Sequence, residues 1–332
     1  MKNAMFWKPL KKKIVQCLLC PRYCIIKSGE RGNCGVRENK NGKLVSLVYG
    51  KIVSANIDPI EKKPLYHFLP GKDTFSIATA GCNFHCMQCQ NWNISQCSAD
   101  KTSIELMPKK VVYECKKLDS KIISYTYTEP TIFYEYMIDT AKLAGRKKIR
   151  NVLVSNGFIN REPLKKLIPF ISAANIDLKG DDKFYRDVAE AWVSPILETL
   201  VVLKKKKVWL EVTNLIIPTL NDSPERIKWL AKWVYDYLGK DTPLHFSAFW
   251  PTHKLKNLPP TPIETLKNAR KIAMKIGLKY VYTGNVNFPE GNNTYCPSCK
   301  KIVIKRSGFY VVENFLKNGK CKCGEKIAGV WK

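Results

Sequence analysis

Between residues 74 and 286, short apolar runs alternate with segments of helical pattern, and this alternation limits the possible folds most strongly. The apolar runs are TFSIATA, IISYTYT, NVLVSN, AANIDLK, VWLEVTNLII, PLHFSAFW and YVYTGNV. The helical patterns between them cover 108–117, 131–145, 162–168, 194–206, 223–238 and 262–276. Strands that alternate with helices imply βαβ units and a parallel sheet. This number of units favours an α/β fold with a partial (β/α)6-type TIM barrel over a doubly wound sheet.

The cysteines form three sets with the spacing of metal ligands. The N-terminal set is Cys17, Cys20, Cys24 and Cys34; the central set is Cys82, Cys86 and Cys89; the C-terminal set is Cys296, Cys299, Cys321 and Cys323. Cys97 and Cys115 stand apart. The N-terminus has basic residues but no apolar core of a signal peptide, so we expect reduced thiols in a cytoplasmic protein. Tight C-x2-C spacing then predicts metal sites rather than disulfides.

These features predict three modules. Residues 1–70 would hold the N-terminal set and a proline-rich connection, residues 71–287 the partial barrel, and residues 288–332 a zinc ribbon. In the ribbon, KIVIKR and FYVVEN are expected to form a hairpin around Ser307-Gly308, with KIAGVW as a third strand. Its four thiolates would close a tetrahedral Zn²⁺ site. The spacing of the N-terminal set suits zinc or an auxiliary [4Fe–4S] cluster, and zinc is the preferred interpretation.

The central set follows the first predicted barrel strand directly. Its thiols should therefore lie on a loop at the C-terminal end of that strand, where barrel enzymes carry their chemistry. Three cysteines can hold a [4Fe–4S] cluster and leave one iron open to a further ligand. The alternative is a zinc knuckle that uses Cys97 as its fourth ligand, because His85 adjoins Cys86 and is poorly placed to turn back onto the same ion.

The chain carries a formal net charge of +28, which suits a polyanion partner such as nucleic acid. Its lysine-rich and glutamine-poor composition is also typical of thermophilic proteins, and solvated lysine runs explain the charge without such a partner. Nucleic-acid binding is therefore the weaker interpretation. No apolar run approaches the ~18 residues of a membrane helix, so no membrane association is expected.

The CxxxCxxC spacing of the central set resembles the motif of the radical S-adenosylmethionine (SAM) superfamily. Gln88 stands where that motif usually has an aromatic residue. SYTYTEPT, VSNGF and NIDLKG follow at successive strands and resemble segments of the glycyl-radical activating enzymes. CLLCPRYC…GNCGVREN, YTYTEPTIFYEY, HFSAFWP and YVYTGNV…NNTYCPSC extend the likeness over nearly the whole chain, where it is greatest to the radical SAM enzyme of the AmmeMemoRadiSam system.

The resemblance implies roles for residues at three strand ends. Glu129 matches the acid that holds the SAM amino group. Ser155 and Asn156 match the second segment and would also bind SAM, with Asn156 able to hydrogen-bond the ribose. Asp177 and Lys179 match the third segment and would contact the ribose, the carboxylate or a cation. Each position also has a plain structural interpretation: Glu129 as a helix cap, Asn156 as part of a turn, and Asp177 with Lys179 as an ion pair.

Two side chains after the sixth predicted strand compete for a further SAM contact. His253 could approach the ribose, as a histidine does in the activating enzymes. In the AmmeMemoRadiSam pattern that histidine more often stands at the position of Trp250, which could instead stack on adenine. Packing or surface exposure is the structural alternative for both.

The resemblance also implies an activity and partners. A radical SAM enzyme similar to pyruvate formate-lyase activating enzyme would be an oxidoreductase that reductively cleaves SAM to a 5′-deoxyadenosyl radical, which abstracts hydrogen from a substrate. Its cofactors would be the [4Fe–4S] cluster, SAM and Zn²⁺, with a flavodoxin or ferredoxin as reductant. The substrate could be a protein that is activated or modified, and RNA is the alternative. Memo-like and AMMECR-like proteins are the implied partners.

Overall fold

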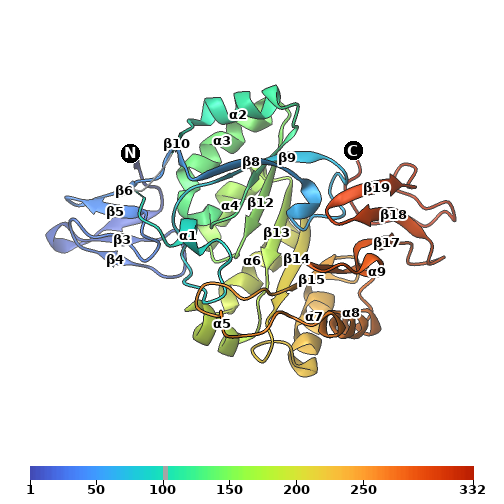
Figure 1. The fold of residues 1–332 in the computed structure, drawn as a ribbon. Helices are drawn as coiled ribbons and strands as arrows, with labels where there is room; N and C mark the ends of the chain where they lie inside the picture. Colours follow the sequence, from blue (N-terminus) through green and yellow to red (C-terminus); the bar gives the residue numbers. More distant parts are fainter. Residues whose placement is uncertain (100–103) are drawn as a thin grey trace. The chain divides into compact units, whose positions relative to one another are not determined.

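The computed structural model describes residues 1–99 and 104–332, which form an α/β protein with a mostly parallel central sheet (Figure 1). Two compact units are distinguished. The first unit is Met1–Asp58, Asp73–Ala173 and Ser194–Thr199, and the second is Pro59–Lys72, Ala174–Val193 and Leu200–Lys332. No helix in these described ranges has both the length and the apolar character needed to cross a bilayer.

The first unit contains the early strands of the predicted alternation. Strands β9 (Asp73–Ala78), β11 (Ile122–Tyr125) and β12 (Arg150–Ser155) pair in parallel, and β8 (Ser54–Pro59) lies beside β9. The associated helices are α2 (Pro108–Lys117), the 3-10 turn η3 (Pro130–Phe133), α3 (Tyr134–Arg146), α4 (Arg161–Leu167) and η4 (Ile168–Phe170). The first half of α6 (Ser194–Lys205) also belongs to this unit, and its second half belongs to the other. The parallel strands and longer helices confirm the predicted pattern, because apolar residues on one face of each element are buried.

The N-terminal part of the first unit is built from short antiparallel strands. One sheet joins β1 (Lys2–Asn3), β6 (Lys43–Ser46) and β5 (Arg37–Lys40), and another joins β2 (Trp7–Pro9), β3 (Val15–Cys17) and β4 (Ile25–Ile26). The pair β7 (Lys51–Ile52) and β10 (Ile104–Glu105) and the turn η1 (Lys11–Lys13) complete it. Within this part the Arg37 guanidinium is buried against Glu135, with Nη1 3.0 Å from Oε1. A buried charge requires such a partner.

The second unit continues the alternation with β13 (Ala173–Asp177), β14 (Trp209–Ile216), β15 (Leu244–Ala248) and β16 (Val281–Gly284). The last three pair in parallel. Helices α7 (Pro224–Leu238) and α8 (Ile263–Ile276) pack against each other, and η2 (Ile60–Lys62) precedes them in the chain. Helix α5 (Asp182–Ala189) was not predicted; its start is capped by the Asp181 carboxylate, which accepts from Phe184 N.

The C-terminal residues form a small antiparallel sheet of β17 (Thr294–Tyr295), β18 (Ile302–Ser307) and β19 (Tyr310–Asn314), preceded by α9 (Pro289–Asn292) (Figure 1). The predicted hairpin is confirmed. The predicted third strand is wrong, because β17 takes that place. KIAGVW instead runs beside the loop after η2, where Val330 N donates to His67 O, and Val330 bridges Phe68 in parallel.

A buried polar network supports this end of the second unit. The Glu211 carboxylate accepts from the backbone N–H of Tyr66 at 3.0 Å and of His67 at 2.8 Å, and it lies 2.7 Å from His245 Nε2. Burial lowers the pKa of His67 to about 4, so its ring is neutral at physiological pH. A fully satisfied network of this kind defines one arrangement of the surrounding core.

Candidate functional site

The central cysteines lie on the loop that follows β9, before the short helix α1 (Trp92–Ser95). Gly81 N donates to Ile94 O at 3.3 Å, which closes the loop onto α1. Cys89 N donates to Cys86 O at 3.2 Å, a turn that brings those two cysteines onto one side of the loop. The predicted position of the central set at the end of the first barrel strand is therefore correct.

Cys82 is the most deeply placed thiol of the central set. Burial raises its pKa well above the ordinary value, and the Glu129 carboxylate and Cys86 raise it further. Phe84 N donates to Cys82 Sγ at 3.4 Å and partly offsets this rise. The three thiols thus share one environment with Glu129, and a metal would have to replace their protons to become stably bound.

The distances between the cysteine sulfurs indicate whether a set suits a single metal ion or a multi-iron cluster. Among the described residues, the C-terminal set is the one group of metal-ligating side chains whose ligand atoms all lie within 4.8 Å of one another. The central thiols are not grouped this closely, which disfavours a single ion and is compatible with a multi-iron cluster. Gln88 Oε1 is buried in the same loop without a hydrogen-bond partner, so an acceptor remains for a further group.

The competing zinc knuckle needs a fourth ligand, and the two candidates are engaged elsewhere. His85 Nδ1 lies 2.7 Å from Gln96 Oε1, and its Nε2 lies 3.1 Å from the Asn33 side chain. The Cys97 thiol donates to Ile94 O at 3.3 Å. Neither side chain therefore turns toward the central thiols, which favours a cluster with an open iron.

Glu129 joins the ends of two neighbouring strands. It precedes η3 and caps it, with Oε1 accepting from Thr131 N at 2.8 Å and from Ser155 Oγ at 2.7 Å. Its Oε2 accepts from Asn156 N at 2.8 Å. Burial raises the pKa of Glu129, and these hydrogen bonds oppose the rise. The Thr131 side chain adds a further hydrogen bond to the same carboxylate, so these neighbours fix its orientation.

Asn156 connects Glu129 to the cysteine loop. Its Nδ2 donates to Asn83 Oδ1 at 2.8 Å, and its Oδ1 accepts from Phe158 N at 2.9 Å. Asn83, directly after Cys82, in turn donates to Phe158 O at 2.9 Å. The sequence analysis did not assign Asn83 or Gln88 a role. Their only signal was their place inside the cysteine motif, because their partners lie far along the chain.

Asp177 and Lys179 belong to the second unit, at the end of β13. Lys179 Nζ lies 2.6 Å from Asp177 Oδ2, so the ion pair considered from the sequence is present. Asn214 Nδ2 donates to the Lys179 carbonyl at 3.0 Å and Asn221 Nδ2 to the same carbonyl at 2.7 Å. The backbone of this strand end is thus held firmly, and the SAM contacts of both side chains remain a prediction.

His253 and Trp250 also lie in the second unit, after β15. Burial and the neighbouring Lys254 and Lys256 lower the pKa of the half-buried His253, so its ring is neutral near pH 7. Trp250 is 55% exposed, and its indole Nε1 donates to Asn285 O at 3.4 Å. Trp250 therefore has the open face needed for stacking on a ring, while His253 has a neutral imidazole.

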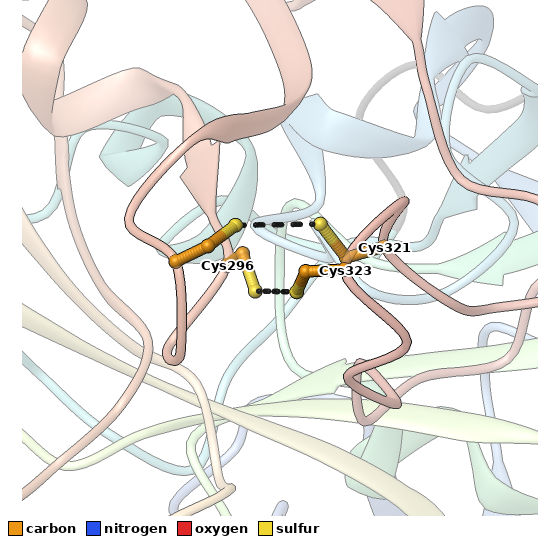
Figure 2. Close-up of side chains that lie close together, drawn as sticks. Cys296, Cys321 and Cys323 are labelled. Atoms are coloured by element: carbon orange, nitrogen blue, oxygen red, sulfur yellow. Dashed lines mark hydrogen bonds between the residues drawn. The ribbon is translucent and has the colours of Figure 1, made fainter.

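The C-terminal set is arranged as one compact group. Cys296 Sγ lies 3.6 Å from Cys323 Sγ, and Cys299 Sγ lies 3.7 Å from Cys321 Sγ (Figure 2). Four sulfurs at about 2.3 Å from one zinc ion lie about 3.8 Å from one another. This set therefore has the dimensions of a tetrahedral site for a single metal ion.

Tyr66, Tyr282, Val303 and Ile327 pack around the C-terminal set and shield it. The side of the site that faces the module's core is therefore apolar. Burial beside such groups disfavours bare thiolates, so a bound cation would stabilise them.

The N-terminal set surrounds a small cavity within the first unit. All four cysteines line it, together with the buried guanidinium of Arg37. Burial raises the pKa of Cys20 to about 12 and that of Cys34 to about 11. The four thiols therefore line one cavity, as their spacing predicted. They are not grouped as closely as the four thiols of the C-terminal set.

Comparison with known proteins bears on this site. A family model for the radical SAM superfamily matches residues 76–234, a range that includes the central cysteines and Glu129. The chain is 49% identical over 331 residues to the uncharacterized protein MJ0808 of Methanocaldococcus jannaschii. The match covers 98% of this chain and 99% of that protein.

Two solved structures give further similarity. A radical SAM methyltransferase from Sphaerobacter thermophilus has a TM-score of 0.52 and 13% identity, covering 66% of this chain and 68% of its own. A domain of pyruvate-formate lyase-activating enzyme from Bacteroides vulgatus has a TM-score of 0.43 and 17% identity, covering 49% of this chain and 98% of its own. The likeness to the methyltransferase supports the fold and says nothing about the substrate.

Proposed function

Because the chain belongs to the radical SAM superfamily, we propose that Cys82, Cys86 and Cys89 hold a [4Fe–4S] cluster at which SAM is bound and cleaved. The observation that carries this proposal is the set of three thiols on one loop beside the carboxylate of Glu129. When bound, the cluster would supply the electron for reductive cleavage of SAM, and a 5′-deoxyadenosyl radical would then take a hydrogen atom from the substrate. Enzymes of the superfamily use a reductant, for which a flavodoxin or ferredoxin is proposed here.

The residues around the cluster would bind and orient SAM. Glu129 would accept a charge-assisted hydrogen bond from the SAM ammonium. Ser155 and Asn156 would hold Glu129 in place, since their groups already donate to it. Gln88 Oε1, buried without a partner, offers a second acceptor for SAM and replaces the aromatic residue of the usual motif.

Asp177, Lys179 and His253 are proposed as SAM contacts of the second unit. Lys179 would reach the SAM carboxylate or ribose with its ammonium group, and Asp177 would orient it through their ion pair. The neutral ring of His253 can donate to or accept from a ribose hydroxyl.

The C-terminal set is proposed to bind zinc as a structural ion. Its sulfur separations match a tetrahedron of four thiolates around one zinc ion, and all four positions would be filled by protein. Such a site takes no part in catalysis, and its role would be to hold β17–β19 in place.

A protein is the proposed substrate, activated or modified by hydrogen abstraction, with Memo-like and AMMECR-like proteins as proposed partners. RNA is the second candidate, favoured by the net charge of +28. In the first unit, Lys109, Lys142 and Arg146 line one groove of about 390 Å³ on the surface of α2 and α3. Asp139 and the apolar Met107, Pro108 and Leu143 line the same groove, so it is only partly basic and supports RNA less than a continuous basic surface would.

The test is the electron paramagnetic resonance (EPR) spectrum of the anaerobically reconstituted, reduced protein with and without SAM. We expect SAM to shift the cluster signal and Cys86→Ala to abolish it. In Glu129→Gln at equal iron content, SAM affinity should fall about ten- to a hundredfold, because a hydrogen bond to a charged group is worth about 1.5–3 kcal/mol. A signal unchanged by SAM would refute the assignment, and equal affinities would leave Glu129 as a helix cap only.

A further inference from the structure

We propose that the N-terminal set of Cys17, Cys20, Cys24 and Cys34 holds a second [4Fe–4S] cluster, which passes electrons to the central site. The identity of this second metal group is argued from the geometry of the N-terminal set alone. Its role as an electron relay rests on the function proposed above. This assignment replaces the zinc ion preferred from the sequence.

The four thiols are not grouped as closely as the ligands of a single zinc ion. They line a cavity of about 20 Å³ together with neighbouring side chains. Within the described part of the chain, the C-terminal set shows the close spacing expected of zinc, and the N-terminal set does not. A four-iron cube needs the wider arrangement.

Arg37 provides a second, independent observation. Its side chain is 1% exposed and lines the same cavity. Nη1 is paired with Glu135 and Nη2 donates to Met5 O at 2.5 Å, but Nε is buried without any hydrogen-bond partner. A buried N–H left unpaired is costly. The sulfide or thiolate of a cluster would accept from it, an interaction of the kind that tunes cluster potentials.

The backbone around the cavity also approaches the metal position closely. Asn33 N donates to Cys24 Sγ at 3.5 Å. A Cβ added at Gly32 would lie 3.7 Å from the same sulfur and 3.3 Å from Ile26 Cδ1. The loop therefore provides a backbone N–H to sulfur and a close backbone approach to the cavity.

The two cysteine sets share a wall, and this makes electron transfer between them feasible. A Cβ added at Gly81, the residue before Cys82, would lie 2.7 Å from Cys34 O. Arg22 Nε donates to Asn83 O at 2.7 Å, and Asn83 itself lines the N-terminal cavity. Gly81 and Asn83, on either side of Cys82, thus contact the N-terminal set and its cavity. Sequence reasoning could not establish this proximity, because the two sets are far apart along the chain.

The relay step balances as a single electron transfer. A low-potential one-electron donor such as a reduced flavodoxin or ferredoxin would be oxidised, and the N-terminal cluster would be reduced. The same electron would then pass to the cluster on the central cysteines. No bond forms or breaks in this step. Four thiolates leave no open iron, so the N-terminal cluster would carry electrons and bind no substrate.

The test of the second cluster uses the full chain with Cys82→Ala, Cys86→Ala and Cys89→Ala, reconstituted anaerobically with iron and sulfide. We expect about four iron and one zinc per chain, and an EPR signal on reduction that SAM does not change. About two zinc and no iron would overturn the proposal. Adding Cys20→Ala and Cys24→Ala should remove the remaining iron. Cys115→Ala, at a buried thiol outside all three sets, is the matched control and should keep it.

The relay is tested separately in a chain with Cys20→Ala and Cys24→Ala and an intact central set. Reduction of the central cluster by reduced flavodoxin should be lost, while reduction by dithionite, a small molecule, is kept. Equal reduction by both donors would overturn the relay. A failure of the proposed SAM chemistry would appear instead as a parent protein whose central cluster does not respond to SAM.

Discussion

The N-terminal and C-terminal cysteine modules have the same number of thiols but differ in how those thiols are arranged. In the C-terminal module the paired sulfurs lie 3.6 and 3.7 Å apart. In the N-terminal module they surround a cavity of about 20 Å³. Each module also contains a buried arginine that pairs with a glutamate from another part of the same unit, Arg306 with Glu61 and Arg37 with Glu135. The number of cysteines therefore does not identify the metal group; the distance between them does.

The two buried ion pairs differ in which polar atom is left without a hydrogen-bond partner. Arg37 reaches both oxygens of Glu135, at 3.0 and 3.2 Å, but keeps a free Nε beside the cavity. All three nitrogens of Arg306 have acceptors, whereas Oε2 of its partner Glu61 has none. Beside the N-terminal set, proposed to hold a cluster, the atom without a partner is a donor, Arg37 Nε. In the ion pair of the C-terminal module, proposed to hold zinc, it is an acceptor, Glu61 Oε2.

The largest expected effect is the loss of the C-terminal metal. Structural zinc in small modules contributes about 10–16 kcal/mol of apparent binding free energy, and without it the short strands lack a sufficient core. In a variant with Cys296→Ala and Cys299→Ala, we expect one zinc to be lost and amide hydrogen exchange in β18 and β19 to become rapid. The control with Cys20→Ala and Cys24→Ala should leave exchange in these strands unchanged. Protection that persists without metal would contradict a structural role for the ion.

The second prediction concerns the ion pair of the N-terminal module. Arg37→Met leaves the Glu135 carboxylate buried without its cation, which should lower the free energy of unfolding by about 3–5 kcal/mol. Urea unfolding of variant and parent measures this loss. Adding Glu135→Gln should restore most of the stability, because the amide oxygen can still accept from Met5 N. A double variant as unstable as the single one would show that the pair is not the cause.

The third prediction concerns how the free energy of unfolding depends on pH through Glu61. Burial raises the pKa of Glu61 from 4.5 to about 7, and Arg306 only partly offsets this. The folded state therefore binds a proton more tightly than the unfolded state, so this stabilisation is complete below about pH 4.5 and is lost as pH rises to about 7. At about 1.4 kcal/mol per unit, the loss is about 3 kcal/mol.

Urea titrations between pH 4.5 and 8 should show this decline in the parent and not in Glu61→Gln. Parallel curves for the two proteins would mean that Glu61 keeps its charge at neutral pH.

The smallest effect is expected for two buried asparagines. Asn83 lies next to Cys82 of the central set, and Asn292 lies four residues before Cys296 of the C-terminal set. Asn83→Ala removes the acceptor of Asn156 Nδ2, and Asn292→Ala removes the acceptor of the Tyr66 hydroxyl. Each change leaves a buried donor unpaired and should lower stability by about 1–3 kcal/mol in urea unfolding. Only Asn83→Ala should also change the EPR signal of the central cluster. An unchanged signal in both variants would separate Asn83 from the proposed site.

Much of the fold could be predicted because its signals are local. The strand ends that carry Glu129 and Asp177 were expected from apolar runs of a few residues, and the hairpin around Gly308 from a turn between two such runs. Helix α5 was missed because its start depends on a side-chain cap at Asp181 rather than on a long apolar pattern. KIAGVW was assigned to the wrong strand partner, because its apolar residues do not specify which backbone they pair with.

The sequence by itself determined which residues could bind metal, since thiols at two- and three-residue spacing must lie close together. It also determined the position of the central cysteines, because a loop begins where its strand ends. Only the tertiary structure decided that Asn83 meets Asn156, that Arg37 meets Glu135, and that Cys34 lies against Gly81. These contacts join segments far apart along the chain, and their distances depend on how the intervening strands pack. The same packing sets the separation of the thiols, and with it the metal group that each set can hold.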